Sequence, residues 1–365
     1  MKLLIDLSGC DMPYSSITVY SLRILRGLKD NRVKDVTVLS NTVVYETVRR
    51  LVPEFEVLPI EMSRKLSPFS VIKGYFRWRQ IVKRINFDVI YLPHPFPPYH
   101  CIYNKGRIVT TILDIEGLRA YSGIKLVVFK LVYPFVMKRS HRLTTISAFV
   151  RQDVLSEYQF IDADKILPVH CSVVLGHCDD SKGSPINEPY ILYVSSFLKH
   201  KNVMTLVKAF GILKDRIPHR LVLIGRENDY WRAEVLPIIE SNQIASRIVH
   251  VKNSVTDDEL VSYYKYADLF VHPSYMEGFG YPPIEAAILE TPVLTTRETA
   301  IPEVTMDLLN YYEPSTDERK LANRILEVLQ NPPSKERLME ISEIYRKEYD
   351  YRKIAKELYD ELLKV

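Results

Sequence analysis

The segment from Ser274 to Leu294 carries the residue types and spacing that best fit chemistry on a phosphorylated ligand. It runs SYMEGFGYPPIEAAILETPVL, so a glycine-bearing turn is followed at once by Pro282 and Pro283. Proline is favoured at a helix start, and the N–H groups of a turn and of a first helical turn point outward without partners. Together with the helix dipole they make an anion site. The turn residues that would line it are Gly278, Phe279 and Gly280, whose glycines let the backbone approach a phosphate closely.

Two carboxylates flank this turn and suggest a division of roles. Glu285 falls near the first turn of the expected helix, where it can accept hydrogen bonds from the vicinal hydroxyls of a ribose. Glu277 precedes the turn, so it would lie on the other side of the phosphates and face a sugar. Either carboxylate alone would be interpreted as a surface residue at a helix start. The complete string favours a ligand site.

The string resembles the E-x7-E region of the retaining GT-B glycosyltransferases of family 4, or glycosyltransferase group 1, whose pattern is close to EGFGxPxxEAxxxGxPV. The match departs at Glu290, where the family usually has glycine. The resemblance implies an α/β protein with two Rossmann-like domains facing each other across a cleft. It also implies a hexosyltransferase that moves a sugar from a UDP- or GDP-linked donor to a hydroxyl of a glycan or lipid-linked acceptor. The configuration at the anomeric carbon would be retained, and neither a metal nor another cofactor would be required.

A second match to the family lies in YVSSFLKHKN, from Tyr193 to Asn202, which is similar to YVGxxxxRKN. By this resemblance Lys201 lies against the donor phosphates, with Ser196 and His200 beside it. His200 replaces the usual arginine, so a second cation is present at neutral pH only if His200 is protonated. The alternative for Lys201 is an ordinary exposed lysine at a helix start. Further on, Val251 begins a stretch that resembles the family's base-binding loop.

The first half resembles the family less specifically, as expected of a region that binds a variable acceptor. Asp114 ends the run TILD, which resembles a T-x-H-D strand end, although Leu113 replaces the histidine that usually meets the donor sugar. The catalytic candidates are therefore Glu277, Lys201 and Asp114. The acceptor-side candidates are Ser15, Ser16, His94 and Ser147. For His94 the alternative is a loop residue among prolines.

Apolar runs alternate with amphipathic stretches along the whole chain, which is typical of βαβ units stacked into parallel sheets. The strands expected in the first half are Lys2–Leu7, Val36–Ser40, Val89–Leu92, Ile108–Leu113 and Leu143–Ile146. In the second half they are Tyr190–Ser195, Leu221–Gly225, Ile248–Val251, Leu269–His272 and Val293–Thr296. The polar stretch from His177 to Pro189 predicts a linker. We therefore expect an acceptor-binding domain over 1–180, a donor-binding domain over 181–350, and a last helix over 351–365 that packs back onto the first domain.

Composition narrows the class of protein further. The chain has 365 residues, 47% of them hydrophobic and 26% charged, and a formal net charge of +4, which gives no reason to expect nucleic acid. The four cysteines include no CxxC pair, and the DxD run at Asp162–Asp164 is short enough to arise by chance, so we expect no metal. The first apolar run is too short for a signal peptide, which favours the cytoplasm.

Two basic, aromatic stretches, 69–85 and 124–142, allow two interpretations. They are either buried helices with solvated basic faces, or a surface that docks peripherally on anionic lipid at the inner face of a membrane. Two alternative functions also stay open. One is a nucleotide-sugar epimerase or hydrolase of the same fold, and the other is a noncatalytic nucleotide-sugar-binding partner.

Overall fold

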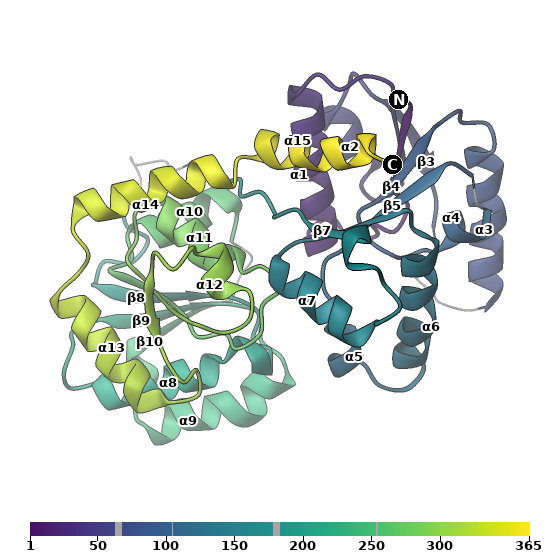
Figure 1. The fold of residues 1–365 in the computed structure, drawn as a ribbon. Coiled ribbons are helices and arrows are strands. Elements are labelled where there is room, and N and C mark those ends of the chain that lie inside the picture. The colour runs from purple at the N-terminus through teal and green to yellow at the C-terminus, as the bar shows by residue number, and fades with distance from the viewer. Residues whose placement is uncertain (63–67, 104, 178–182, 253–254) are drawn as a thin grey trace. The chain divides into compact units, whose positions relative to one another are not determined.

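The computed structural model describes residues 1–62, 68–103, 105–177, 183–252 and 255–365. They form two compact units (Figure 1), one of Met1–Ser172 with Tyr349–Val365 and one of Val173–Glu348. The division falls at 172/173, ahead of the 180/181 boundary expected from the sequence. The expected linker begins inside the second unit, and part of it, 178–182, lies outside the described residues.

The first unit is built on a parallel sheet of seven strands in the order β3-β2-β1-β4-β5-β6-β7. Its strands are β1 (Leu3–Leu7), β2 (Val36–Asn41), β3 (Glu56–Ile60), β4 (Val89–Leu92), β5 (Arg107–Ile112), β6 (Arg142–Thr145) and β7 (Ile166–Pro168). Its helices are α1 (Ser16–Asp30), α2 (Tyr45–Leu51), α3 (Pro68–Val82), α4 (Tyr99–Tyr103), α5 (Gly117–Ala120), α6 (Gly123–Arg139), α7 (Ala148–Glu157) and α15 (Tyr351–Leu363). Strands β1 and β4 are buried along their whole length, as expected of central strands covered by helices on both faces.

The last helix, α15, packs along α1, where the sequence led us to expect it. The two helices approach so closely that a Cβ on Gly27 would lie 2.4 Å from the Ala355 Cβ, so glycine is needed there. At the start of α15, Tyr351 donates a 2.7 Å hydrogen bond to the Asp30 carboxylate. The chain end is thereby fixed to the first helix of the same unit.

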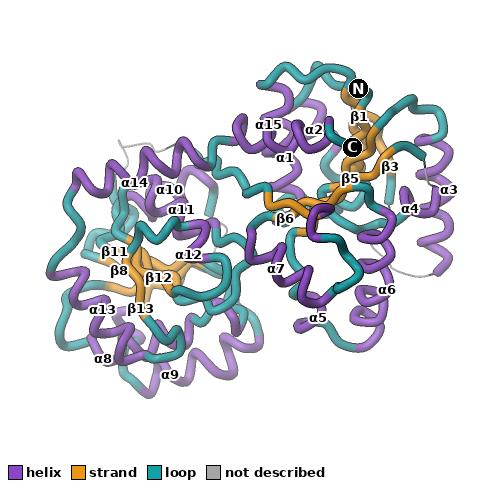
Figure 2. The backbone as a smooth tube through the Cα atoms, viewed as in Figure 1, coloured by secondary structure: helices purple, strands orange, loops and turns teal. Residues whose placement is uncertain are grey.

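The second unit has a six-stranded parallel sheet in the order β10-β9-β8-β11-β12-β13. Its strands are β8 (Tyr190–Val194), β9 (Arg220–Ile224), β10 (Ile248–Val251), β11 (Leu269–His272), β12 (Val293–Thr296) and β13 (Asn310–Tyr312). Its α-helices are α8 (Val203–Leu213), α9 (Leu236–Ser241), α10 (Asp257–Lys265), α11 (Tyr281–Ile288), α12 (Ile301–Val304), α13 (Glu318–Gln330) and α14 (Lys335–Glu348). Figure 2 shows the orange strands of this unit enclosed by its helices.

These sheets confirm the expected fold class of two Rossmann-like α/β domains. The sequence did not predict β3, β7 or β13. Strand β3 is a half-exposed edge strand that contains Pro59, a residue tolerated at edges but not in central strands. Strands β7 and β13 have three residues each, which is too short for a recognisable alternation.

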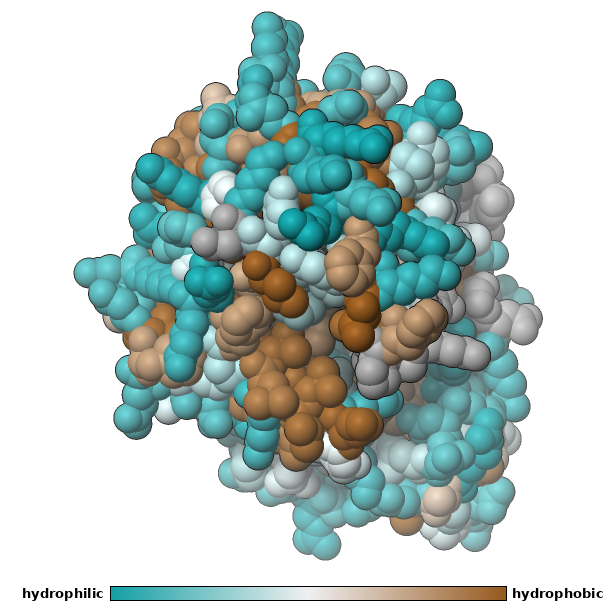
Figure 3. Space-filling model, turned by 90° about the vertical axis from the view of Figure 1, so that its right-hand side faces the viewer, coloured by the Kyte–Doolittle hydropathy of each residue, from teal (hydrophilic) through white to brown (hydrophobic). Residues whose placement is uncertain are grey.

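One face of the first unit exposes large apolar side chains, which gather into a patch in Figure 3. Those on α3 and α6 are Phe69, Val71, Ile72, Phe76, Ile124, Val127, Leu131 and Phe135. Within the described ranges, no helix combines the length and the apolar character that crossing a bilayer demands.

Candidate functional site

The carboxyl ends of β8 and β11 meet at the centre of the second sheet. These strands are hydrogen-bonded neighbours, and the strand order reverses between them. Such a switch point is the usual ligand site of an open α/β sheet, because the loops on its two sides diverge and leave a crevice. The loop after β8 carries Lys201 at the end of a 3-10 turn, and the loop after β11 carries Glu277.

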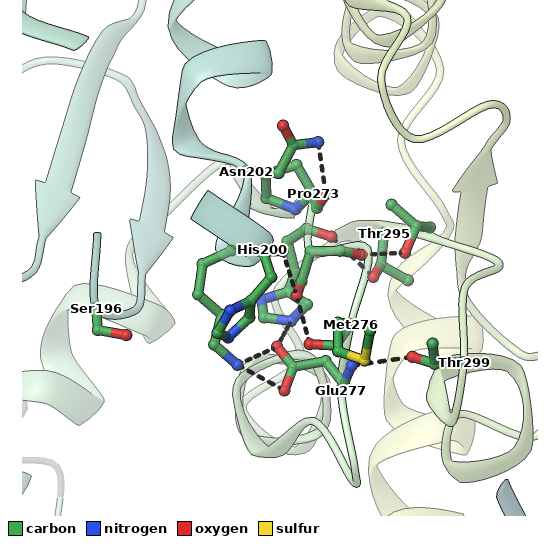
Figure 4. Close-up of polar contacts among 12 residues, drawn as sticks. Ser196, His200, Asn202, Pro273, Met276, Glu277, Thr295 and Thr299 are labelled. Carbon is green, nitrogen blue, oxygen red and sulfur yellow. Dashed lines mark hydrogen bonds and ion pairs between the residues drawn. The ribbon is translucent and has the colours of Figure 1, made fainter. Parts of the chain in front are cut away.

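Lys201 and Glu277 form a bidentate ion pair at this switch point (Figure 4). Lys201 Nζ lies 2.8 Å from both Glu277 Oε1 and Glu277 Oε2. A third residue, His272, ends β11 and places its Nε2 2.9 Å from Glu277 Oε1. The Glu277 residue is only 9% exposed and His272 only 1%, so this carboxylate is held largely out of water.

The ion pair keeps Glu277 ionised despite its burial. Burial on its own raises the pKa of Glu277, but the Lys201 charge and the hydrogen bond from His272 outweigh it and hold this pKa well below its usual value. Because the carboxylate can only accept hydrogen bonds, His272 Nε2 must carry a proton and donate it. The other ring nitrogen, His272 Nδ1, has no hydrogen-bond partner among the described residues.

Hydrogen bonds join the two loops that carry the pair. The His200 carbonyl accepts hydrogen bonds from Ser274 Oγ and from the Tyr275 N–H, each at 3.0 Å. Asn202, in a left-handed conformation with φ of 57°, donates through Nδ2 to the carbonyls of Pro273 (3.0 Å) and Ser315 (2.8 Å). The positions of Lys201 and Glu277 therefore rest on a rigid backbone frame.

The glycine turn connects Glu277 to helix α11, as the sequence predicted. Gly280 has φ of 90°, and a Cβ there would lie 2.6 Å from Ile301 Cδ1, so only glycine fits. Helix α11 starts at Tyr281, and no side chain caps its N-terminus. Phe279 is buried. Because Pro282 and Pro283 have no N–H, the start of α11 offers fewer backbone donors than the sequence led us to expect, and the positive end of its helix dipole is the feature that favours an anion.

Glu285 lies on α11 and is held by a buried tyrosine of α10. Tyr264 Oη donates to Glu285 Oε2 at 3.2 Å. Burial, reinforced by the Glu285 charge, raises the pKa of Tyr264 well above its usual value, so this hydroxyl stays protonated and remains a donor. One carboxylate oxygen of Glu285 is thereby fixed.

The other candidates of the second unit are Ser196, His200 and Val251. Ser196 is exposed and stands apart from the residues around Glu277 in Figure 4. His200 is half-buried in the same 3-10 turn as Lys201. Val251 is the last residue of β10, and residues 253 and 254 of the expected base-binding loop lie outside the described residues.

Two of the candidates in the first unit cap helices. Ser15 Oγ accepts a hydrogen bond from Thr18 N at 3.2 Å at the start of α1, and Ser147 Oγ accepts one from Val150 N at 3.1 Å at the start of α7. Such caps stabilise a helix whatever its function. Ser16 is the exposed first residue of α1.

The remaining candidates of the first unit lie in loops. Asp114 is exposed after β5, and its Oδ1 accepts a hydrogen bond from Glu116 N at 3.0 Å. His94 Nδ1 accepts one from Phe96 N at 3.2 Å, and its Nε2 lies 3.4 Å from Tyr133 Oη. Burial lowers the pKa of His94 to about 4, so the ring is neutral near pH 7.

The sequence did not single out His272 or Tyr264. The signal at His272 was available, since it is a polar residue at the carboxyl end of an otherwise apolar strand, LFVH. No comparable signal marked Tyr264, because one tyrosine among several in α10 is not distinguished by spacing.

The DxD run of the first unit has a local structural role. Asp162 Oδ1 accepts a hydrogen bond from Asp164 N at 3.0 Å and caps a short 3-10 turn. Within the part of the chain that the structure describes, no three His, Cys, Asp or Glu side chains are grouped so that they could hold a metal ion.

Two Rossmann-like sheets of this kind are found in the GT-B class of glycosyltransferases. Residues 179–344 match the family described as glycosyl transferases group 1. The O-antigen chain mannosyltransferase RfbU of Salmonella typhimurium is 26% identical over 339 residues, which cover 90% of this chain and 92% of that protein. The N,N'-diacetylbacillosaminyl-diphospho-undecaprenol alpha-1,3-N-acetylgalactosaminyltransferase of Campylobacter jejuni is 23% identical over 375 residues, 96% of this chain and 97% of that protein.

Solved structures show the same fold. Anabaena Alr3699/HepE in complex with UDP and glucose superposes with a TM-score of 0.77 at 13% identity, over 100% of both chains. A glycosyltransferase from Rickettsia africae gives a TM-score of 0.72 at 20% identity, over 100% of this chain and 99% of that one. The protein is a glycosyltransferase of the GT-B type, related to the O-antigen mannosyltransferases.

Proposed function

We propose that this protein is a retaining family 4 hexosyltransferase that moves a sugar from a UDP- or GDP-linked donor to a hydroxyl of a glycan or lipid-linked acceptor, without a metal. In this proposal residues 181–350 bind the donor and residues 1–180 bind the acceptor. The observation that carries it is the Lys201–Glu277 ion pair, placed at the switch point of the second sheet beside the glycine turn and α11.

Lys201 supplies positive charge for a leaving diphosphate. An ammonium group has three N–H donors, and two of them are used on Glu277, so the third is available for a phosphate oxygen. The N-terminal end of α11 adds the positive end of its helix dipole. Preorganised donors of this kind stabilise the charge that develops as the bond to phosphate breaks.

The reaction needs no protein nucleophile. The bond between the anomeric carbon and the phosphate oxygen breaks and its electron pair stays on the diphosphate. The acceptor hydroxyl oxygen forms the new bond on the same face, and its proton passes to the departing phosphate. Glu277 would then orient the transferred sugar and Glu285 the ribose, while Asp114 acts on the acceptor side.

The names of relatives suggest which substrates to try first. The O-antigen relatives are named as mannosyltransferases, which makes GDP-mannose the first donor to test. The Campylobacter relative is named for a sugar on diphospho-undecaprenol, which supports a lipid-linked acceptor.

We also propose that the enzyme works in the cytoplasm at the inner face of a membrane, through α3 and α6. Both helices expose apolar side chains, of which Phe69 and Ile124 are the most exposed at 77% and 80%. The sequence from 62 to 87 and from 117 to 152 contains lysines and arginines but no Asp or Glu. Exposed apolar residues beside an excess of positive charge are the features that bind anionic lipid, although Arg77 of α3 is paired with Glu61.

The test is a transfer assay that compares Lys201→Ala with Lys199→Ala. Thermal shift with UDP, GDP and their sugars first identifies the donor, because a ligand that binds only the folded state raises the melting temperature. Lys201→Ala should then lower the transfer rate at least ~10²-fold, the usual effect of removing one donor to a developing anion. Lys199 is the matched control, since it lies in the same turn but is exposed and pairs with Glu234.

Three results would contradict the proposal. Conversion of the donor with no acceptor present would indicate an epimerase or hydrolase. Donor binding without any transfer would indicate a noncatalytic partner. Equal rates for Lys201→Ala and Lys199→Ala would remove Lys201 from the mechanism.

A further inference from the structure

The loop that follows β12 holds the backbone of Glu277 (Figure 4). Strand β12 pairs with β11, so its carboxyl end lies next to the loop that carries Glu277. Thr299 Oγ1 accepts a hydrogen bond from Glu277 N at 2.9 Å, and Ala300 N donates one to the Glu277 carbonyl at 3.4 Å. The N–H and the carbonyl of Glu277 are therefore both bonded to consecutive residues of a different loop.

Two further threonines tie the same loop to β12, but they contact it nearer to β11. Thr295 Oγ1 donates to the His272 carbonyl at 3.0 Å, and Thr296 Oγ1 donates to the Ser274 carbonyl at 2.7 Å. Both of these threonines are fully buried. Thr299 differs from them, since it is half-buried and its hydroxyl accepts the hydrogen bond. Its contact is also the furthest along the loop of the three, at the residue that carries the paired carboxylate.

Thr299 makes this contact from a left-handed backbone conformation, with φ of 53°. Among the described non-glycine residues with positive φ, it is the one with a β-branched side chain. Its two Cβ substituents crowd the backbone at positive φ, so the conformation is costly. Strain of this kind persists where the surrounding contacts require it, and it is concentrated at functional sites. A glycine would adopt the conformation more easily, but it would place no hydroxyl at this point.

The contact with Thr299 complements the ion pair. Lys201 and His272 hold the carboxylate of Glu277, whereas Thr299 holds its peptide. The turn that follows contains two glycines, and glycine leaves the backbone the greatest freedom to rotate. Without a restraint on its peptide, Glu277 could rotate at the start of this turn and carry its carboxylate with it.

The same loop also leads to the lysine side of the pair. Ser315 Oγ donates to Glu298 Oε1 at 2.8 Å, and the Ser315 carbonyl accepts from Asn202 Nδ2 at 2.8 Å. Asn202 directly follows Lys201 in the chain. Two consecutive residues, Glu298 and Thr299, thus connect the loop after β12 to the segments that carry both partners of the ion pair.

We propose that Thr299 is a positioning residue for sugar transfer, because it fixes the Glu277 peptide so that the carboxylate meets the transferred sugar in one orientation. This inference rests on the proposed function, in which Glu277 orients the sugar. It assigns the strained conformation of Thr299 to that task. Since Thr299 bonds to the backbone of Glu277 and not to Lys201, its loss lowers the transfer rate and leaves the lysine in place for the diphosphate.

Three substitutions of Thr299 separate the hydrogen bond from the strain. Thr299→Val keeps the branched shape but has no acceptor, so it should lower kcat for transfer roughly 10-fold, as expected when a backbone N–H loses its partner. Its affinity for the nucleoside diphosphate, measured by calorimetry, should match that of wild type. Thr299→Ser keeps the hydroxyl and should recover most of the kcat. Thr299→Gly relieves the strain but has no hydroxyl, so it should lose as much kcat as Thr299→Val.

Thr305→Val is the matched control for the loss of a threonine hydroxyl. Thr305 is fully buried in the same unit, and its Oγ1 donates to the Ile301 carbonyl at 2.6 Å at the end of α12. This variant should lower the melting temperature, because a hydrogen bond of the fold is lost, but it should keep the kcat of wild type.

Hydrogen exchange at the Glu277 amide tests the contact without any substrate. This N–H should exchange at least ~10-fold faster in Thr299→Val than in wild type, and Thr299→Ser should retain the protection. Equal exchange rates in wild type and Thr299→Val would overturn the proposal, as would an unchanged kcat in Thr299→Val or a recovered kcat in Thr299→Gly. A parallel loss of diphosphate affinity in Thr299→Val would show general disruption of the site and would also overturn it. Absence of transfer by wild type would instead contradict the proposed function, and the exchange rates would still decide whether Thr299 holds Glu277.

Discussion

At the scale of single residues, the buried Glu277 carboxylate contacts both a cation, Lys201, and a histidine, His272. Burying a charge is costly unless it is paired and hydrogen-bonded, and both conditions are met by Lys201 and His272. The same contacts limit the directions in which the carboxylate can point. A carboxylate fixed in this way can orient a sugar without rearrangement during the reaction.

The lowered pKa of Glu277 predicts a pH-dependent contribution to stability. A carboxyl whose pKa is lower in the folded state stabilises the fold fully above its unfolded pKa of about 4.3, and this contribution is lost as pH falls toward the folded pKa. Urea unfolding of wild type and Glu277→Gln should therefore differ most near pH 7, and the difference should shrink below about pH 4.3. If the difference in the free energy of unfolding between the two proteins stays constant or grows on acidification, the ion pair does not lower the pKa of Glu277.

His272 should act as a positioning residue for Glu277. His272→Phe removes the Nε2 donor and should lower kcat/KM for transfer by roughly 10-fold or more, as for a lost hydrogen bond to a charged group. His272→Gln keeps an N–H donor and should recover most of that loss. If both variants lose activity equally, or neither does, the hydrogen bond to Glu277 is not the reason for the histidine.

The sequence predicted the members of this centre but not their pairing. Lys201 and Glu277 were identified from separate strings that lie 76 residues apart, and only the adjacency of β8 and β11 brings them together. Periodicity predicts strands, but it does not state which strands are neighbours. The contact with His272 depends on the same adjacency.

At the scale of elements, Glu290 lies just after the C-terminal end of α11, at the position where the family pattern has glycine. Glu290 has φ of 62°, and its N–H and that of Thr291 bond back to the carbonyls of Ala287 (3.0 Å) and Ala286 (3.1 Å). This is the Schellman arrangement, in which glycine is preferred because a Cβ is strained at positive φ. The helix end therefore forms with glutamate at some cost in stability.

Glu290→Gly should stabilise the protein without changing the site. Relief of the left-handed strain outweighs the greater entropy of glycine in the unfolded chain, for a net gain of about 0.5–1 kcal/mol in the free energy of unfolding. Urea denaturation measures this gain in the free energy of unfolding. Glu290→Ala, which keeps the Cβ, should give no gain, and equal stability of the two variants would show that strain is absent.

The strands that the sequence placed correctly share one property. β4, β10, β11 and β12 were predicted with the bounds observed, and all are apolar runs between clear turn signals. Strand β3 lacked that contrast because it is half exposed and contains Pro59, and β13 because it has only three residues. Edge position alone does not hide a strand, since β10 is a half-buried edge strand whose apolar run was recognised.

At the scale of the whole molecule, the switch points of the two sheets differ in character. In the second unit the switch point holds the buried Lys201–Glu277 ion pair beside the glycine turn. In the first unit it opens into a pocket of about 410 Å³ with a mainly apolar lining.

The apolar patch on α3 and α6 predicts selective binding to anionic vesicles. Sedimentation should show stronger binding to vesicles that contain phosphatidylglycerol than to pure phosphatidylcholine, and salt should weaken it. The double variant Phe69→Ser with Ile124→Ser should bind at least ~10-fold less, since two apolar side chains no longer insert. Ile212→Ser, an exposed apolar position on α8 of the second unit, is the control. Equal binding of wild type and both variants would contradict the proposal that the exposed side chains of α3 and α6 bind the membrane.

The most direct test of the central claim is a crystal structure of the full chain with bound GDP or UDP, whichever raises its melting temperature. We expect the diphosphate at the carboxyl ends of β8 and β11, with a phosphate oxygen within hydrogen-bond distance of Lys201 Nζ and close to the glycine turn and the N-terminal end of α11. We expect Glu285 to face the ribose. A nucleotide bound elsewhere, with Lys201 paired to Glu277 alone and the glycine turn empty, would contradict the account.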